Sequence, residues 1–176
     1  GWVTSIIQRA AASQERINEF LHTVTDISST HEEETELNGK IEFRNVSFRY
    51  PDSGIVALDH VSFVVEPGKS LAILGKTGSG KSTIANLIGR MYDASDGSIW
   101  VDDQNIRKLS LSSLRRQTGY VPQDVFLFSD TIANNIAFGL TDSSSPAERK
   151  SLIEQAAKDA VIHDNIRSFP KSYETF

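Results

Sequence analysis

The stretch GKTGSGKST at residues 75–83 decides the fold of this chain. It fits the pattern G-x-x-x-x-G-K-[ST] of a phosphate-binding loop, whose glycines let backbone N–H groups turn toward a phosphate chain. In that pattern the lysine reaches the β- and γ-phosphates and the hydroxyl after it takes one Mg²⁺ coordination position. The alternative is a Gly/Ser loop without a ligand. We predict a polyphosphate site formed by Gly75, Lys76, Thr77, Gly78, Ser79, Gly80, Lys81, Ser82 and Thr83, with Ser82 as a Mg²⁺ ligand.

The residues on either side of the loop support this prediction. Residues 71–74 read LAIL, a short apolar run that is typical of a parallel strand buried on both faces. After the loop, apolar residues recur at helical spacing, which predicts a helix from about Lys81 with one apolar stripe, formed by Ile84, Leu87, Ile88 and Met91. The N-terminus of such a helix carries a partial positive charge and would point at the phosphates.

The composition narrows the class of protein. The chain has 176 residues, 39% of them hydrophobic, a formal net charge of −5 and no cysteine. Disulfides and thiolate metal sites are therefore excluded, and a reducing compartment is compatible. Five acids and no Lys or Arg lie between Asp26 and Glu36, which leaves the rest of the chain without net charge and without a basic stripe for nucleic acid. No apolar run approaches the length of about 18 residues that a spanning helix needs.

The hydrophobic pattern also predicts the other elements. Residues 2–24 have an apolar face at helical spacing, and the acidic stretch that follows lacks periodicity and is interpreted as a solvated linker. Residues 41–50 alternate, but the phase slips after Asn45, which predicts a bulge or a break between two strand segments. Further strands are expected at 61–65, 98–101 and 119–121, and helices at 109–116, 131–137, 146–160 and 161–168.

Three segments, taken in order, resemble the nucleotide-binding domain of exporter-type ATP-binding cassette (ABC) transporters. They read KIEFRNVSFRYP at 40–51, ALDHVSFVVEPGKSLAILGKTGSGKST at 57–83 and GYVPQDVFLFSDTIANNI at 119–136. The resemblance implies an α/β fold with a P-loop NTPase-like core, an antiparallel β subdomain and a preceding helix, with ATP and Mg²⁺ as ligands. It covers residues 40–176. Residues 1–25 resemble the end of the last transmembrane-domain helix, and residues 26–39 the acidic linker after it.

The resemblance also implies further site residues. Tyr50 would stack on adenine, although it also fits a core aromatic. Gln123 would bind Mg²⁺ and sense the γ-phosphate, which makes it a catalytic residue together with Lys81; a simple loop hydrogen bond is the alternative. Phe126 and Phe128 would lie at an apolar groove that receives a coupling helix of the transmembrane domain, although ordinary core packing suits either ring alone.

Other family motifs are absent from the sequence. An LSGGQ-like signature, the second nucleotide motif with its catalytic glutamate and the switch histidine do not occur, and in the family they follow a segment like residues 168–170. We therefore expect a domain truncated before the signature, without ATP hydrolysis of its own. Most of the strands that flank residues 71–74 in the family also come from later sequence.

The leading interpretation is the ATPase part of an exporter. The parent protein would hydrolyse ATP between two such domains, at the cytoplasmic face of the membrane, to drive export; the transmembrane domain and a second nucleotide-binding domain would be its partners. This chain itself is expected to be soluble. One alternative is a non-hydrolysing nucleotide-binding module for regulation or assembly. A small P-loop kinase is disfavoured, because two predicted strands precede the loop.

Overall fold

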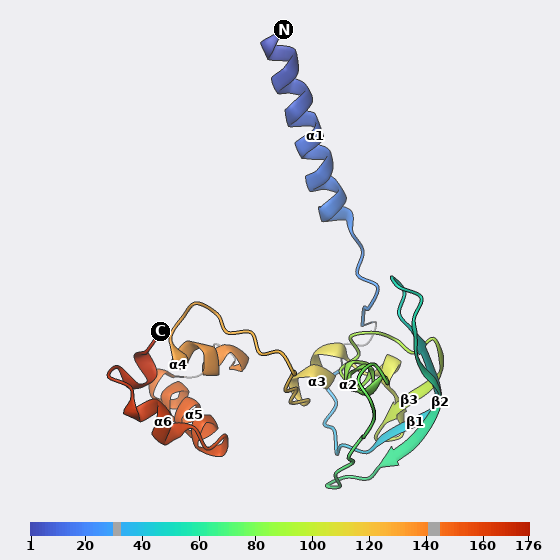
Figure 1. Ribbon diagram of the computed structural model, residues 1–176, viewed down its shortest axis with the longest axis vertical. Coiled ribbons are helices and arrows are strands. Elements are labelled where there is room, and N and C mark those ends of the chain that lie inside the picture. The colour runs from blue at the N-terminus through green and yellow to red at the C-terminus, as the bar shows by residue number, and fades with distance from the viewer. Residues whose placement is uncertain (30–32, 141–144) are drawn as a thin grey trace. The chain divides into compact units, whose positions relative to one another are not determined.

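The computed structural model describes residues 1–29, 33–140 and 145–176, and the chain forms two compact units, residues 1–120 and 121–176. The first contains α1 (Trp2–His22), β1 (Ile41–Arg49), β2 (Val56–Val65), α2 (Lys81–Ile88), β3 (Asp96–Val101), β4 (Gln104–Asn105), the 3-10 turn η1 (Ile106–Lys108) and α3 (Leu111–Arg116). The second contains α4 (Ile132–Ile136), η2 (Ala137–Gly139), α5 (Pro146–Asp159), α6 (His163–Ser168) and η3 (Ser172–Glu174) (Figure 1).

The sheet of the first unit is antiparallel, with strand order β2-β1-β3-β4. Phe43 of β1 lies opposite Phe63 of β2, and their rings stack with centroids 4.4 Å apart. The register shifts between Phe43 and Val46, where Asn45 adopts a φ of 51°. This bulge confirms the predicted phase slip. It also brings Phe43 and Val46 onto one buried face, although they are three residues apart.

The hydrophobic core of this unit lies between the sheet and two short helices. Phe43, Val46 and Phe48 of β1 are at most 2% exposed and belong to one buried cluster with side chains of α2 and α3. Ile84 and Leu87 come from α2 and Leu114 from α3. The predicted apolar stripe is thus correct for α2 up to Ile88, but the helix ends there with Gly89 as its C-cap, and Met91 lies beyond it, 49% exposed.

Two strand predictions are wrong. Residues 71–74 have no regular structure, and Leu74 is 92% exposed; residues 119–121 are likewise not a strand, and Val121 is 91% exposed. The physical reason is that a strand exists only through hydrogen bonds to a neighbour, and no strand among the described residues pairs with either segment. Within the described residues, the sheet is therefore purely antiparallel.

The acidic side chains that the structure describes in the linker are exposed, as expected of a solvated segment, but part of the linker backbone is held on the domain. Residues 30–32 lie outside the described residues, and the backbone beyond them follows polar side chains of α3. The Ser113 hydroxyl accepts from Thr35 N at 3.1 Å and donates to Thr35 O at 2.8 Å, and Gln117 Oε1 accepts from Leu37 N at 2.9 Å. The Asp102 carboxylate then accepts the backbone N–H groups of residues 38–40.

The predicted N-terminal helix is present as α1, and all of its residues are exposed. Among the helices that the structure describes, none combines the length and the apolar character needed to cross a membrane.

The second unit is helical and close to the predicted ranges. Thr131 caps α4 by accepting from Asn134 N at 3.1 Å, and Ser145 caps α5 by accepting from Glu148 N at 3.3 Å. Pro146 occupies the first position of α5, where its missing N–H costs nothing. Ile153 and Ile166 are buried, so α5 and α6 each direct an apolar side chain inward.

Candidate nucleotide-binding site

The phosphate-binding loop at residues 75–83 depends on two glycines with left-handed backbone. Gly78 has φ +80° and Gly80 has φ +84°. A Cβ on Gly78 would meet nothing within 4 Å, whereas a Cβ on Gly80 would lie 2.3 Å from the carbonyl oxygen of Ala57. Gly80 is therefore needed both for its conformation and because the loop backbone passes directly against β2.

Helix α2 begins at Lys81, as predicted, and presents its N-terminus to the loop. Gly80 is its N-cap and supplies no side-chain acceptor, and the first turn contains no acidic residue. The first N–H groups of a helix have no partner within the helix. Together with the helix dipole they favour an anion at this end. The local sequence thus leaves the helix start ready for phosphate.

The Lys81 ammonium spans the loop. Nζ donates to Gly75 O at 2.9 Å and to Lys76 O at 2.8 Å, so the positive charge is held across the loop by its own backbone. Ser82 is the next residue and is exposed. The structure therefore brings the predicted lysine and hydroxyl together on the first turn of α2.

Tyr50 follows the last residue of β1 and contacts the same helix. Its hydroxyl lies 2.9 Å from Thr83 Oγ1, and its ring packs edge-on against Phe48 and Tyr92 with centroids 4.9 and 5.5 Å away. The ring thus packs on the core cluster, as the core interpretation expects, and its hydroxyl reaches the loop residue Thr83; stacking on adenine stays a prediction. The sequence analysis did not identify Tyr92 or the hydrogen bond to Thr83. The one feature that could have indicated Tyr92 is its position as an aromatic residue shortly after the helix that follows the loop.

Gln123 belongs to the second unit, whereas the phosphate-binding loop belongs to the first. Its side chain is exposed on a segment without helix or strand. Its roles in Mg²⁺ binding and γ-phosphate sensing therefore stay predictions.

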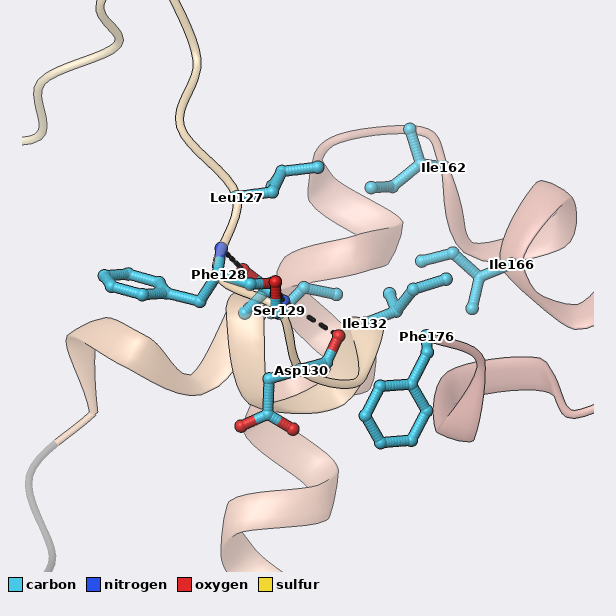
Figure 2. Close-up of a pocket in the computed structure, with 10 residues that line it drawn as sticks. Leu127, Phe128, Ser129, Asp130, Ile132, Ile162, Ile166 and Phe176 are labelled. Carbon is cyan, nitrogen blue, oxygen red and sulfur yellow. Dashed lines mark hydrogen bonds between the residues drawn. The ribbon is translucent and has the colours of Figure 1, made fainter.

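Phe126 and Phe128 lie on the same segment, and both are exposed, by 76% and 46%. The two rings meet edge-on at 5.1 Å, and Phe128 stacks on Phe138 at 4.7 Å. Beside them a cavity of about 710 Å³ has a mostly apolar lining (Figure 2) that includes Leu127, Phe128, Ile132, Ile162, Ile166 and Phe176. The sequence singled out Phe128 but not the isoleucines of α4 and α6, because single apolar residues on a short helix predict only core packing.

Asp130 at the rim of this cavity is the N-terminal neighbour of the α4 cap. The Asn134 side chain donates to its carboxylate at 2.8 Å and the backbone N–H of Thr131 at 2.7 Å. The bond from Asn134 and, to a smaller extent, the bond from Thr131 hold the pKa of Asp130 below its ordinary value. The carboxylate is therefore ionised at neutral pH and stabilises the start of α4.

Comparison with known proteins agrees with this geometry. The family model described as "ABC transporter" matches residues 58–174. The ABC transporter ATP-binding protein YfiB of Bacillus subtilis is 45% identical over 97% of this chain and 29% of its own length. The ATP-dependent lipid A-core flippase of Pseudomonas aeruginosa is 40% identical over 98% of this chain and 28% of its own length.

A solved structure gives the same result. A bacterial Atm1-family ABC exporter with ATP bound superimposes with a TM-score of 0.82 and 37% identity, covering 99% of this chain and 30% of that one. The chain thus spans less than a third of these relatives. The exporter-type resemblance found in the sequence is confirmed, and this chain belongs to the ABC transporter family.

Proposed function

We propose that this chain supplies the ATP-binding face of an exporter that is driven by ATP hydrolysis. The observation that carries the proposal is the phosphate-binding loop, which is already closed by Lys81 and directed at the N-terminus of α2. Relatives of this chain are exporters and a lipid flippase, and a loop of this kind binds the phosphates of a nucleotide. The exported substrate would be selected by other parts of the protein.

Each loop residue has a distinct role in the proposal. Backbone N–H groups of residues 75–83 and the start of α2 hold the phosphates, and the Lys81 ammonium neutralises charge that develops during phosphoryl transfer. The exposed Ser82 hydroxyl is an oxygen donor of the type that Mg²⁺ accepts beside phosphate oxygens and water. When bound, Mg²⁺ would neutralise phosphate charge. Tyr50 holds adenine by stacking, and Gln123 provides a second Mg²⁺ ligand.

The proposal places two partners around this chain. A second nucleotide-binding domain would place its signature opposite the phosphate-binding loop of this chain. The 176 residues themselves contain no signature, no second nucleotide motif and no switch histidine. Without these groups no base positions or activates water, so this chain alone is expected not to hydrolyse ATP. Residues 1–25 would continue the last helix of a transmembrane domain, with residues 26–39 as linker to residues 40–176, at the cytoplasmic face of the membrane.

The cavity beside Phe128 is the proposed docking site for a coupling helix of the transmembrane domain. An apolar cavity with two exposed aromatic rings suits the apolar side of a partner helix. Cross-linking from position 126 in the full-length transporter should capture that domain; capture of other segments only would contradict the assignment.

Replacement of Lys81 tests the proposed function. In the full-length transporter, Lys81→Ala should weaken MgATP binding by about 10- to 150-fold, because a charge-assisted contact contributes about 1.5–3 kcal/mol. ATP turnover should fall with it. Lys69→Ala is the matched control, since Lys69 is exposed and precedes the loop. Unchanged affinity and turnover in Lys81→Ala would contradict the proposal. If Lys81→Ala loses affinity but the wild type binds ATP without hydrolysing it, the result would favour the non-hydrolysing module.

A further inference from the structure

We propose that Thr83 is a positioning residue for the base of the nucleotide, acting through its hydrogen bond to the Tyr50 hydroxyl. The inference rests on the proposed function, because it concerns the same ATP site. From the sequence, Thr83 is assigned to the phosphate-binding loop, directly after Ser82. The structure joins it instead to the aromatic ring that would receive adenine.

The backbone around Tyr50 is fixed by a tight turn. Tyr50 N donates to Ile55 O at 3.0 Å, and Gly54 N donates to Tyr50 O at 2.9 Å. The position of the Tyr50 Cα is therefore set by the end of β1, and only the two side-chain torsions remain to be determined. Edge contacts with Phe48 and Tyr92, at interplanar angles of 80° and 85°, limit the ring on two sides.

The hydrogen bond of the Tyr50 hydroxyl restricts the remaining rotation of the Tyr50 side chain. Thr83 is 3% exposed and lies in the first turn of α2, so its Oγ1 is a rigid anchor inside the domain. The 2.9 Å bond to Tyr50 links the end of β1 to the helix that begins at Lys81, across 33 positions of the sequence. The stacking plane and the phosphate-binding loop are thereby held in one geometry before any nucleotide arrives.

This arrangement predicts an effect that depends on the base. Stacking on an aromatic ring requires a defined ring plane, and a ring held in advance loses less conformational entropy when the ligand binds. Loss of the bond should therefore weaken the binding of ligands that carry a base. Inorganic tripolyphosphate has the phosphates but no base, so its affinity should depend on the loop and on Lys81 alone.

The test compares MgATP with magnesium tripolyphosphate in calorimetric titrations of the full-length transporter. Tyr50→Phe keeps the ring and removes its hydroxyl, and Thr83→Val keeps the shape of Thr83 and removes its hydroxyl. Each should weaken MgATP binding by about two- to tenfold, the range of one net hydrogen bond, and Tyr50→Phe, which lies outside the phosphate-binding loop, should leave tripolyphosphate binding unchanged. The double variant should lose no more than either single variant, and Thr83→Ser should restore the affinity.

A matched control removes another tyrosine hydroxyl that contacts α2. Tyr120 donates to Asn86 Oδ1 at 3.3 Å, so Tyr120→Phe removes a comparable bond and should leave both affinities unchanged. Circular dichroism and thermal unfolding verify that each variant is folded, and Tyr50→Phe remains informative if Thr83→Val is not.

Three results would overturn the inference. Equal loss of MgATP and tripolyphosphate binding in Tyr50→Phe would mean that the bond supports the phosphate end of the site and does not position the ring for the base. Unchanged MgATP binding in Tyr50→Phe would mean that the bond is idle. Tighter MgATP binding would mean that the bond competes with the nucleotide. Failure of the proposed function itself would give a different result. Either wild type would bind neither MgATP nor tripolyphosphate, or Lys81→Ala would bind both ligands with the affinity of wild type.

Discussion

Gly80 offers the sharpest test of how this fold builds its phosphate-binding loop. Gly78 and Gly80 have nearly the same left-handed φ, +80° and +84°, but different surroundings. A Cβ at position 78 would point into open space, and one at position 80 would meet Ala57 O at 2.3 Å and Leu58 Cδ2 at 2.9 Å. The pair therefore separates the cost of backbone conformation from the cost of close packing.

The expected magnitudes follow from these two terms. Alanine in left-handed conformation costs about 1–2 kcal/mol, which both variants share. Gly80→Ala must also move β2 or the loop away from the new methyl group, and overpacking of this kind costs about 1–3 kcal/mol more. We expect a loss of about 1–2 kcal/mol in the free energy of unfolding for Gly78→Ala and about 2–5 kcal/mol for Gly80→Ala.

Urea unfolding of the 176-residue chain without nucleotide measures both losses. Gly139→Ala is the neutral control, because Gly139 has no left-handed φ and a methyl group added there would meet no atom within 4 Å. Equal destabilisation by Gly78→Ala and Gly80→Ala would refute the reasoning, since it would show that contact with β2 contributes nothing. A stable Gly80→Ala would refute it more directly.

Two further predictions concern the linker and the second unit. Ser113 is 2% exposed, and its hydroxyl holds both backbone groups of Thr35. Ser113→Ala should therefore raise amide hydrogen exchange at residues 35–40, whereas Ser112→Ala on the same helix should not. Because the pKa of Asp130 is lowered in the folded chain, its carboxylate stabilises the fold at pH values above the ordinary pKa of about 3.9. This stabilisation is lost as the pH falls through the lowered pKa. Asp130→Asn should therefore lower the melting temperature at pH 7, and its difference from wild type should shrink as the pH falls below about 3.9. A difference that stays constant as the pH falls would contradict the assignment; Asp124→Asn is the control.

Local signals in the sequence predicted the features that local physics determines. The glycines at 78 and 80 have left-handed φ, α2 begins at Lys81 and the phase slip after Asn45 is a bulge. Each of these depends on a few adjacent residues, and so a single sequence carries the information. Family membership, shown by the comparisons, also removes the small P-loop kinase from consideration.

The failures have a common cause in contacts between distant residues. The run LAIL at 71–74 has the composition of a buried strand, but a strand needs a neighbour, and composition does not supply one. The linker adds contacts that its composition does not predict. Its described acidic side chains are exposed as expected, whereas its backbone makes hydrogen bonds with Ser113 and Gln117, about 80 positions away. Side-chain charge says little about where backbone N–H and C=O groups find partners.

The candidate site combines both kinds of information. Its phosphate end is readable because the glycines, Lys81 and the helix start are contiguous, and each residue type has one physical task there. Its base end is not, because Tyr50, Thr83 and Tyr92 come together only through the packing of β1 on α2. The sequence can indicate a tyrosine for stacking, but it does not determine the plane in which the ring lies. The hydroxyl bond to Thr83 supplies that orientation, so the geometry of the base end follows from the fold of the antiparallel sheet against α2.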